Sequence, residues 1–170
     1  MKILLEGRPG SGKTTVAARF AELLRERGVP LGGFLTHELR TGSGRVGFEL
    51  ETFEGARATL AHVDFDGPPR VGKYGVDLEA LETVGVPALE RLPRSSVVVV
   101  DELGKMELAS ERFRDAVSRI FESPVTVVAT VQAARHPFTD GIKERPDVER
   151  VTVTRANRDE LPADLVDRVA

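Results

Sequence analysis

The chain has 170 residues, a formal net charge of -3 at pH 7 and no cysteine. This length suits one compact domain and is short for two, so we expect a single domain over residues 1–170. The lack of cysteine excludes disulfides, thiolate metal sites and cysteine nucleophiles. The acidic balance argues against a general nucleic-acid binder, which would carry a basic face.

The apolar segments are too short to cross a membrane. The longest is the run of four valines Val97 to Val100, far below the roughly 20 residues that span a bilayer. The N-terminus begins with a strand-like segment and lacks a signal-peptide layout. We therefore expect a cytoplasmic protein without a membrane partner, with the monomer as its default state.

The first 28 residues predict a strand, a glycine-rich loop and a helix. Residues 2–5 form a short apolar run that ends at a glycine-rich turn, which indicates a buried strand. Over residues 13–27 the apolar side chains recur at helical spacing, and Gly28 supplies the end of that helix.

The next segment changes to strand periodicity. Residues 32–39 are strand-like, and Val46, Phe48 and Leu50 alternate with polar or small residues. The intervening Thr41-Gly42-Ser43-Gly44 has turn chemistry, so we expect a β-hairpin here. A weaker strand is predicted at residues 58–63.

Residues 67–75 are predicted to form a loop with a basic tip. Asp77 lies where a helix N-cap belongs, ahead of a run of leucines at helical spacing. We expect Gly85-Val86-Pro87 to kink or break that helix, because proline removes a donor and clashes with the preceding turn.

The C-terminal half alternates strands with helices. The β-branched run at 96–100 is typical of a strand buried on both faces of a parallel sheet. The remaining predictions are a helix at 110–122, strands at 125–131 and 147–153, and a final helix at 159–169. The fold class is therefore α/β, a three-layer sandwich around a mostly parallel sheet with an added antiparallel hairpin.

The segment Gly7-Arg8-Pro9-Gly10-Ser11-Gly12-Lys13-Thr14 matches G-x-x-x-x-G-K-[ST] at every fixed position. Glycines let the backbone wrap around phosphates, and the positive end of the following helix points at the same place. Lys13 is expected to reach the β- and γ-phosphates, and the Thr14 hydroxyl to ligate Mg²⁺. The predicted nucleotide-binding residues here are Gly7, Arg8, Pro9, Gly10, Ser11, Gly12, Lys13, Thr14 and Thr15.

Two carboxylates follow the valine strand. Asp101 would lie at the carboxyl end of a buried parallel strand, where ligands bind in open α/β sheets, and is expected to hold the Mg²⁺ shell. Glu102 is the predicted catalytic base, because a second carboxylate there can polarise a water for attack on the γ-phosphate. The predicted nucleotide-binding residues of this segment are Val97, Val98, Val99, Val100, Asp101, Glu102, Leu103 and Gly104.

Thr130 has two interpretations from sequence. At the end of a buried strand its hydroxyl could sense the γ-phosphate, and threonine is also a good strand former. The residues alone favour neither.

The chain resembles the thermostable P-loop nucleoside-triphosphatase family from end to end. The phosphate loop occurs in many families, whereas the blocks around Lys73-Tyr74 and from Asp101 to Leu108 are distinctive. The matching residues are Gly7 to Thr14, Gly33-Phe34, Thr36, Glu38, Gly44 to Phe48, Arg70 to Asp77, Asp101 to Leu108, Thr154 and Asn157-Arg158.

This resemblance implies slow, Mg²⁺-dependent hydrolysis of ATP, GTP, CTP and UTP to the diphosphate, with little base preference. It also implies a sheet of the recombinase-ATPase type. No departure from the family pattern is evident in the phosphate-binding residues, and residues 135–145 show no family feature.

Phosphoryl transfer needs positive charge against its transition state. Lys105, one short turn after the carboxylates, is a predicted catalytic source of that charge, with a solvated lysine as the alternative. Arg70, Lys73 and Tyr74 lie in a loop that could close over the nucleotide, or simply face solvent.

Asn157 and Arg158 follow the last predicted strand, where a base commonly lies in P-loop folds. Arg158 could stack on the base. Asn157 could bond a base edge, and we favour it as the N-cap of the final helix.

Two other functions stay open. A small nucleotide or nucleoside kinase would have a similar phosphate loop, with residues 135–145 as its lid, although Glu102 weighs against it. A nucleotide-dependent switch would instead move the loop at 70–74 between the triphosphate and diphosphate states.

Overall fold

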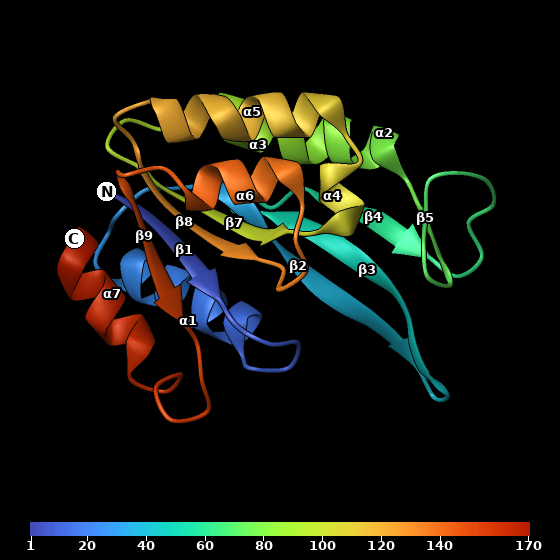
Figure 1. Ribbon diagram of the computed structural model, residues 1–170, viewed down its shortest axis with the longest axis horizontal. Coiled ribbons are helices and arrows are strands. Elements are labelled where there is room, and N and C mark those ends of the chain that lie inside the picture. Colours follow the sequence, from blue (N-terminus) through green and yellow to red (C-terminus); the bar gives the residue numbers. More distant parts are fainter.

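The computed structural model describes residues 1–170, which form one nine-stranded sheet between two layers of helices (Figure 1). Helices α1 (Lys13–Glu26) and α7 (Leu161–Val169) cover one face. The other face carries α5 (Glu111–Glu122), α6 (Pro137–Lys143) and the helical run from Leu78 to Glu90. The predicted α/β sandwich is confirmed.

Five strands form the parallel part of the sheet, in the order β2-β7-β8-β1-β9. Their side chains alternate between the two cores: Ile3 and Leu5 pack under α1 and α7, and Leu4 packs under α5. Because the five strands are parallel, all their carboxyl ends meet at one edge of the sheet. Their bounds are β1 Lys2–Glu6, β2 Leu31–Thr41, β7 Val97–Leu103, β8 Thr126–Val131 and β9 Val148–Thr152.

The rest of the sheet is antiparallel. The predicted hairpin pairs β2 with β3 (Gly44–Thr52), and β4 (Arg57–His62) follows it. The predicted loop at 67–75 is wrong in part, because β5 (Arg70–Val71) and β6 (Tyr74–Val76) pair across a turn in which Gly72 takes a φ of +58°. These two short strands form the sheet edge farthest from β9.

Of the kink or break predicted at Gly85-Val86-Pro87, the break is wrong, and the helix is instead irregular directly before Val86. Helix α2 (Leu78–Ala80), the π-helical segment η1 (Leu81–Gly85) and α3 (Val86–Glu90) follow one another without interruption. Pro87 lies in the first turn of α3, and the wider π-helical turn before it relieves the proline's clash.

The C-terminal third differs from prediction in two further respects. The final helix begins at Leu161 rather than at residue 159. Residues 135–145, to which no element was assigned, contain α6. The side chain of His136 caps α6 by accepting a 3.1 Å hydrogen bond from the Phe138 amide, and Pro137 opens its first turn.

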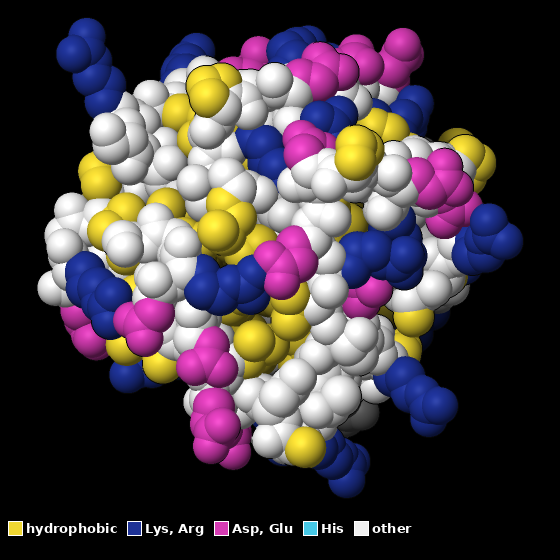
Figure 2. Space-filling view, turned by 60° about the vertical axis from the view of Figure 1, so that its left-hand side comes forward, with side chains coloured by type: hydrophobic (Ala, Val, Ile, Leu, Met, Phe, Trp, Pro, Cys, Tyr) yellow, Lys and Arg dark blue, Asp and Glu magenta, His cyan; other side chains and the backbone are white.

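The surface is mixed in charge. On the face shown in Figure 2, basic and acidic side chains are interspersed, with hydrophobic side chains between them. Ion pairs such as Arg27–Asp167 (3.0 Å) and Arg145–Asp147 (3.0 Å) exemplify this pattern. No helix combines the length and the apolar composition that crossing a membrane requires.

Candidate active site

The phosphate loop joins β1 to α1 at the carboxyl edge of the sheet. Gly12 precedes the first turn of α1 with a φ of +106°, which glycine adopts without strain. A Cβ at Gly7 would lie 2.5 Å from Ser11 Oγ and 2.8 Å from the Val153 carbonyl oxygen, so only glycine fits. The motif thus has the strand-loop-helix context that its chemistry requires.

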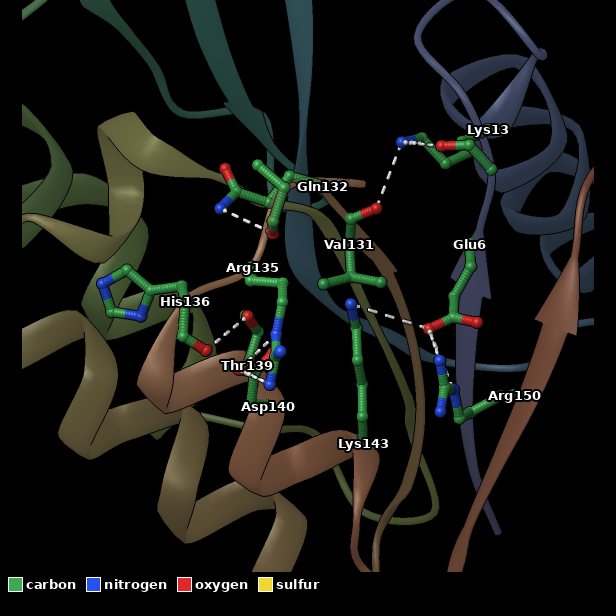
Figure 3. A network of polar contacts seen from close by, with 12 residues as sticks. Glu6, Lys13, Val131, Gln132, Arg135, His136, Thr139, Asp140, Lys143 and Arg150 are labelled. Atoms are coloured by element: carbon green, nitrogen blue, oxygen red, sulfur yellow. Dashed lines mark hydrogen bonds and ion pairs between the residues drawn. The ribbon is translucent and has the colours of Figure 1, made fainter.

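Lys13 is held across the mouth of this loop. Its Nζ donates to the carbonyl oxygens of Gly7 (3.0 Å) and Val131 (3.1 Å), the second of which is drawn in Figure 3. The same ammonium lies 3.6 Å from the Glu102 carboxylate. A cation at this position can contact phosphate oxygens bound by the loop.

Asp101 joins three elements. Its Oδ1 accepts hydrogen bonds from Thr14 on α1 (3.1 Å) and from Thr130 on β8 (2.7 Å). The Thr130 hydroxyl is therefore engaged in a hydrogen bond with the Asp101 carboxylate. Burial raises the pKa of Asp101 to about 6, and the nearby Glu102 adds to the rise. Oδ2 is buried without a partner.

These oxygens fit a small, hard cation. Mg²⁺ takes one or two protein oxygens and completes its shell with water and substrate phosphates. Thr14 and Asp101 supply such a pair beside the phosphate loop, and the unpartnered Oδ2 has an unused acceptor. No larger group of metal-binding side chains gathers anywhere in the chain.

Glu102 projects from an irregularity in the sheet. The β7–β8 pairing runs to Val100 and resumes at Leu103, so the two carboxylates lie between the paired segments. The Glu102 side chain is 35% exposed, which leaves its carboxylate accessible to water. It lines the same cavity as Lys13 and Asp101.

That cavity, which we name the nucleotide cavity, has a volume of about 690 Å³. The phosphate loop forms one wall, and the β2–β3 hairpin forms the facing wall. Its lining residues are Pro9, Gly10, Gly12, Lys13, Thr14, Thr15, Thr36, His37, Glu38, Arg45, Phe48, Asp101, Glu102, Gln132, Ala133 and Arg158.

Some predicted nucleotide-binding residues lie outside it. The side chains of Val97 to Val100 and of Leu103 are buried in the core, so they position Asp101 and Glu102 and do not line the cavity. Gly7, Arg8 and Ser11 face a neighbouring cavity on the other side of the loop tip.

Asn157 does not cap the final helix. Its side chain accepts from the Thr154 amide (2.8 Å) and donates to the Thr152 carbonyl (2.8 Å), so its polar atoms hold the turn after β9. The residue before α7 is Glu160, which makes no side-chain cap. Arg158 lies against Gly12 and lines the nucleotide cavity.

The predicted lid residues lie at a distance from the phosphate loop. Arg70 donates to the carbonyls of Phe65 and Lys73, and the Lys73 ammonium lies 5.5 Å from the Tyr74 ring centroid. None of Arg70, Lys73 and Tyr74 lines the nucleotide cavity. Lys105 is exposed and borders a smaller cavity of about 240 Å³ beside Glu102.

Arg45 is a candidate that sequence reasoning missed. Its Nε donates to the Tyr74 hydroxyl (2.9 Å) and its Nη1 to Glu38 (3.1 Å), while the guanidinium lies 5.1 Å from the Phe48 ring centroid. Tyr74 therefore reaches the nucleotide cavity through Arg45. The signal was present in the family-like block from Gly44 to Phe48, but its role depends on contacts across the sheet.

Glu107 was also missed. It is buried in α4 (Lys105–Leu108), and its Oε2 accepts a 3.2 Å hydrogen bond from the Gly104 amide. Burial raises the pKa of Glu107 to about 8, and the nearby Glu102 carboxylate is the second largest cause of the rise. A carboxyl with this pKa keeps its proton at neutral pH.

The comparisons with known proteins agree with this geometry. The family model described as "NTPase" matches residues 2–166. The chain is 44% identical over 162 residues to nucleoside-triphosphatase THEP1 of Thermotoga maritima, covering 95% of this chain and 91% of that protein. The crystal structure of THEP1 from Aquifex aeolicus superposes with a TM-score of 0.89 at 36% identity, covering 99% of both chains.

The likeness extends to a human protein. The solution structure of a human cancer-related nucleoside triphosphatase superposes with a TM-score of 0.85 at 38% identity, covering 99% of this chain and 96% of that one. The match in sequence and in structure runs through the phosphate loop, the carboxylate strand and the hairpin. The chain therefore belongs to the NTPase family.

Proposed function

We propose that the protein hydrolyses nucleoside triphosphates to the diphosphate and phosphate, slowly, with Mg²⁺ and with little preference for the base. Glu102 carries the proposal: its carboxylate is accessible, follows the buried Asp101, and lies 3.6 Å from the phosphate-loop lysine Lys13. The relatives in Thermotoga maritima and human are both named nucleoside-triphosphatases, which supports the same activity.

In this proposal each residue has a separate task. The phosphate-loop amides and Lys13 bind and orient the β- and γ-phosphates. Glu102 accepts a proton from a water placed in line with the γ-phosphate, and the diphosphate is the leaving group. Thr14 and Asp101 would hold Mg²⁺, which neutralises charge on the phosphate oxygens when bound.

Arg45 is our candidate for the positive charge that the transition state needs. It lines the wall facing the phosphate loop, and two of its three nitrogens are fixed by Tyr74 and Glu38. Its Nη2 makes no such bond and is left to contact phosphate. A planar guanidinium held in place loses little freedom when it binds an oxyanion.

Broad base use follows from the sparse base contacts. Arg158, beside Gly12, is the side chain best placed to stack on a base. The Asn157 amide is engaged with the backbone and is not free to read a base edge. Stacking without edge recognition accepts all four bases.

The experiment measures phosphate release from ATP, GTP, CTP and UTP with Mg²⁺ and no acceptor. We expect release from all four, and a loss of about 10²–10⁴-fold in Glu102→Gln with nucleotide binding kept. Glu54→Gln, an exposed glutamate between strands, is the matched control. A change of only a few-fold in Glu102→Gln would remove Glu102 as the base.

A second candidate function, phosphoryl transfer to an acceptor, has one observation in its favour. The 240 Å³ cavity beside Glu102 is lined by Phe48, Met106 and Lys105 among others, so a small organic acceptor fits there. Tight triphosphate binding without phosphate release, together with a phosphorylated product once an acceptor is added, would support transfer over hydrolysis.

A further inference from the structure

A second cavity adjoins the phosphate loop, on the opposite side of its tip from Thr14 and Asp101. It has a volume of about 670 Å³ and shares only Pro9, Gly10, Gln132 and Ala133 with the nucleotide cavity. Its other walls are the ends of β1 and β9, the turn after β9, and the last residue of α6. We name it the β9 cavity.

The β9 cavity is basic in a chain that is acidic overall. Arg8, Lys143, Arg150 and Arg155 line it, and Glu6 is its one carboxylate, whereas the whole chain has a net charge of -3. Arg8 and Arg155 are exposed and project from the two loops that flank the cavity. Such a concentration of positive charge attracts anions.

Lys143 is the unusual member of this group. Its side chain is only 13% exposed, yet its Nζ lies 3.8 Å from the nearest carboxylate oxygen, Glu6 Oε1, beyond hydrogen-bond distance. Figure 3 shows why: Arg150 reaches the same oxygen, with its Nε at 3.0 Å and its Nη2 at 2.9 Å. The Lys143 ammonium has no hydrogen-bond acceptor within the protein and stays open to the cavity, so it can donate to a bound anion.

We propose that the β9 cavity is a second anion site, which binds a phosphate-class anion such as orthophosphate or pyrophosphate. Lys143 donates to the anion from the cavity floor, and Arg8 and Arg155 close on it from the rim. Thr152 and Thr154 also line the cavity. No aromatic side chain lines the cavity, so it offers no platform for a base.

The test is calorimetric titration of the full chain with pyrophosphate and, separately, with orthophosphate. The phosphate loop is first saturated with Mg²⁺ and a non-hydrolysable triphosphate, the only point at which the test relies on the proposed function. We expect one remaining site, weakened at least about tenfold in Lys143→Met and kept in Lys143→Arg, because a charged hydrogen bond is lost only in the first. The charge-matched control is Arg94→Met: Arg94 is exposed and precedes β7, at the amino ends of the parallel strands and away from the β9 cavity.

Two results would overturn the site: no binding while the triphosphate is bound, or equal binding by the wild type and Lys143→Met. Lys13→Met separates the two proposals without the triphosphate, because it disables the phosphate loop and leaves the β9 cavity intact. If Lys13→Met abolishes all pyrophosphate binding, the loop is the only anion site. If it retains a site sensitive to Lys143→Met, the β9 cavity stands even where hydrolysis is not found.

A second measurement needs no variant. Amide chemical shifts of the wild type are mapped by NMR during the pyrophosphate titration, with the triphosphate bound. We expect the changes to concentrate at residues 141–144 and 152–155, which line or adjoin the β9 cavity. Changes confined to residues 12–15, which line only the nucleotide cavity, would mean that pyrophosphate merely displaces the triphosphate, and would refute the second site.

Discussion

Thr130 on β8 donates a 2.7 Å hydrogen bond to Oδ1 of Asp101 on β7. Only 1% of Asp101 is exposed, and the same oxygen accepts from Thr14 on α1. Burial raises the pKa of this carboxyl, and the two hydroxyls oppose that rise. The state of the carboxylate therefore depends on neighbours from three separate elements.

Thr130→Val should lower the free energy of unfolding by about 1–3 kcal/mol, because it leaves a buried carboxylate oxygen short of a donor while keeping the side-chain shape. Urea denaturation measures the change. Thr126→Val, at the half-buried start of the same strand, should stay within about 0.5 kcal/mol of the wild type. Equal losses in both variants would return Thr130 to the role of a strand former.

Arg45→Met should lower kcat about 10²–10³-fold while changing KM little, because the lost charge acts mainly on the transition state. Steady-state phosphate release measures both constants. Arg40→Met is the control on the same hairpin: Arg40 pairs with Glu38 at 2.9 Å but does not line the nucleotide cavity.

Lys105→Met decides between the two candidate cations. Lys105 is exposed and lies outside the nucleotide cavity, so we expect its loss to lower kcat by less than about tenfold. If Lys105→Met were the slow variant and Arg45→Met retained activity, the catalytic charge would belong to Lys105.

Tyr74→Phe tests whether the segment at 70–74 acts through Arg45. The substitution removes the hydroxyl that accepts from Arg45 Nε and keeps the aromatic ring. We expect a smaller fall in kcat than in Arg45→Met, and no further fall when the two are combined, because both act on one interaction. Multiplying effects in the double variant would show that Tyr74 has a role independent of Arg45.

Glu107 should make stability depend on pH. Burial raises its pKa from 4.5 to about 8, so the folded chain keeps a proton that the unfolded chain releases. The contribution of Glu107 to stability is therefore largest below pH 4.5, falls as pH rises from there to about 8, and is level above that. Asp101, with a pKa of about 6, contributes at the acidic end of this range.

Glu107→Gln keeps an oxygen for the Gly104 amide and cannot titrate. Without nucleotide or Mg²⁺, we expect it to flatten the fall in stability between about pH 5 and 8, and to be more stable than the wild type at the upper end by on the order of a few kcal/mol. Denaturation at several pH values measures this, with Glu54→Gln as control. Parallel curves would show that Glu107 does not titrate in this range.

The local parts of the site could be predicted from the sequence. The phosphate loop, the strand before it and the helix after it depend on spacing within some 25 residues, and the structure has all three. The position of Asp101 followed from one buried valine run, because a strand enclosed on both faces must end at the sheet's edge. Glycine and proline were less reliable: Pro87 lies inside a continuous helical run, since a π-helical turn accommodates it.

The contacts between distant segments could not be predicted. The pairing of Arg45 with Tyr74 depends on strand register. Lys143 lacks a hydrogen-bond acceptor because Arg150 from β9 already contacts the nearest carboxylate oxygen of Glu6. Periodicity in one chain segment carries no information about which side chains meet across a sheet. By itself the sequence determined the phosphate loop and the main strands and helices, since these follow from local backbone preference and hydrophobic spacing, but not β5, β6 or α6. The tertiary structure alone decided which charges share a cavity, because that depends on how separate elements pack.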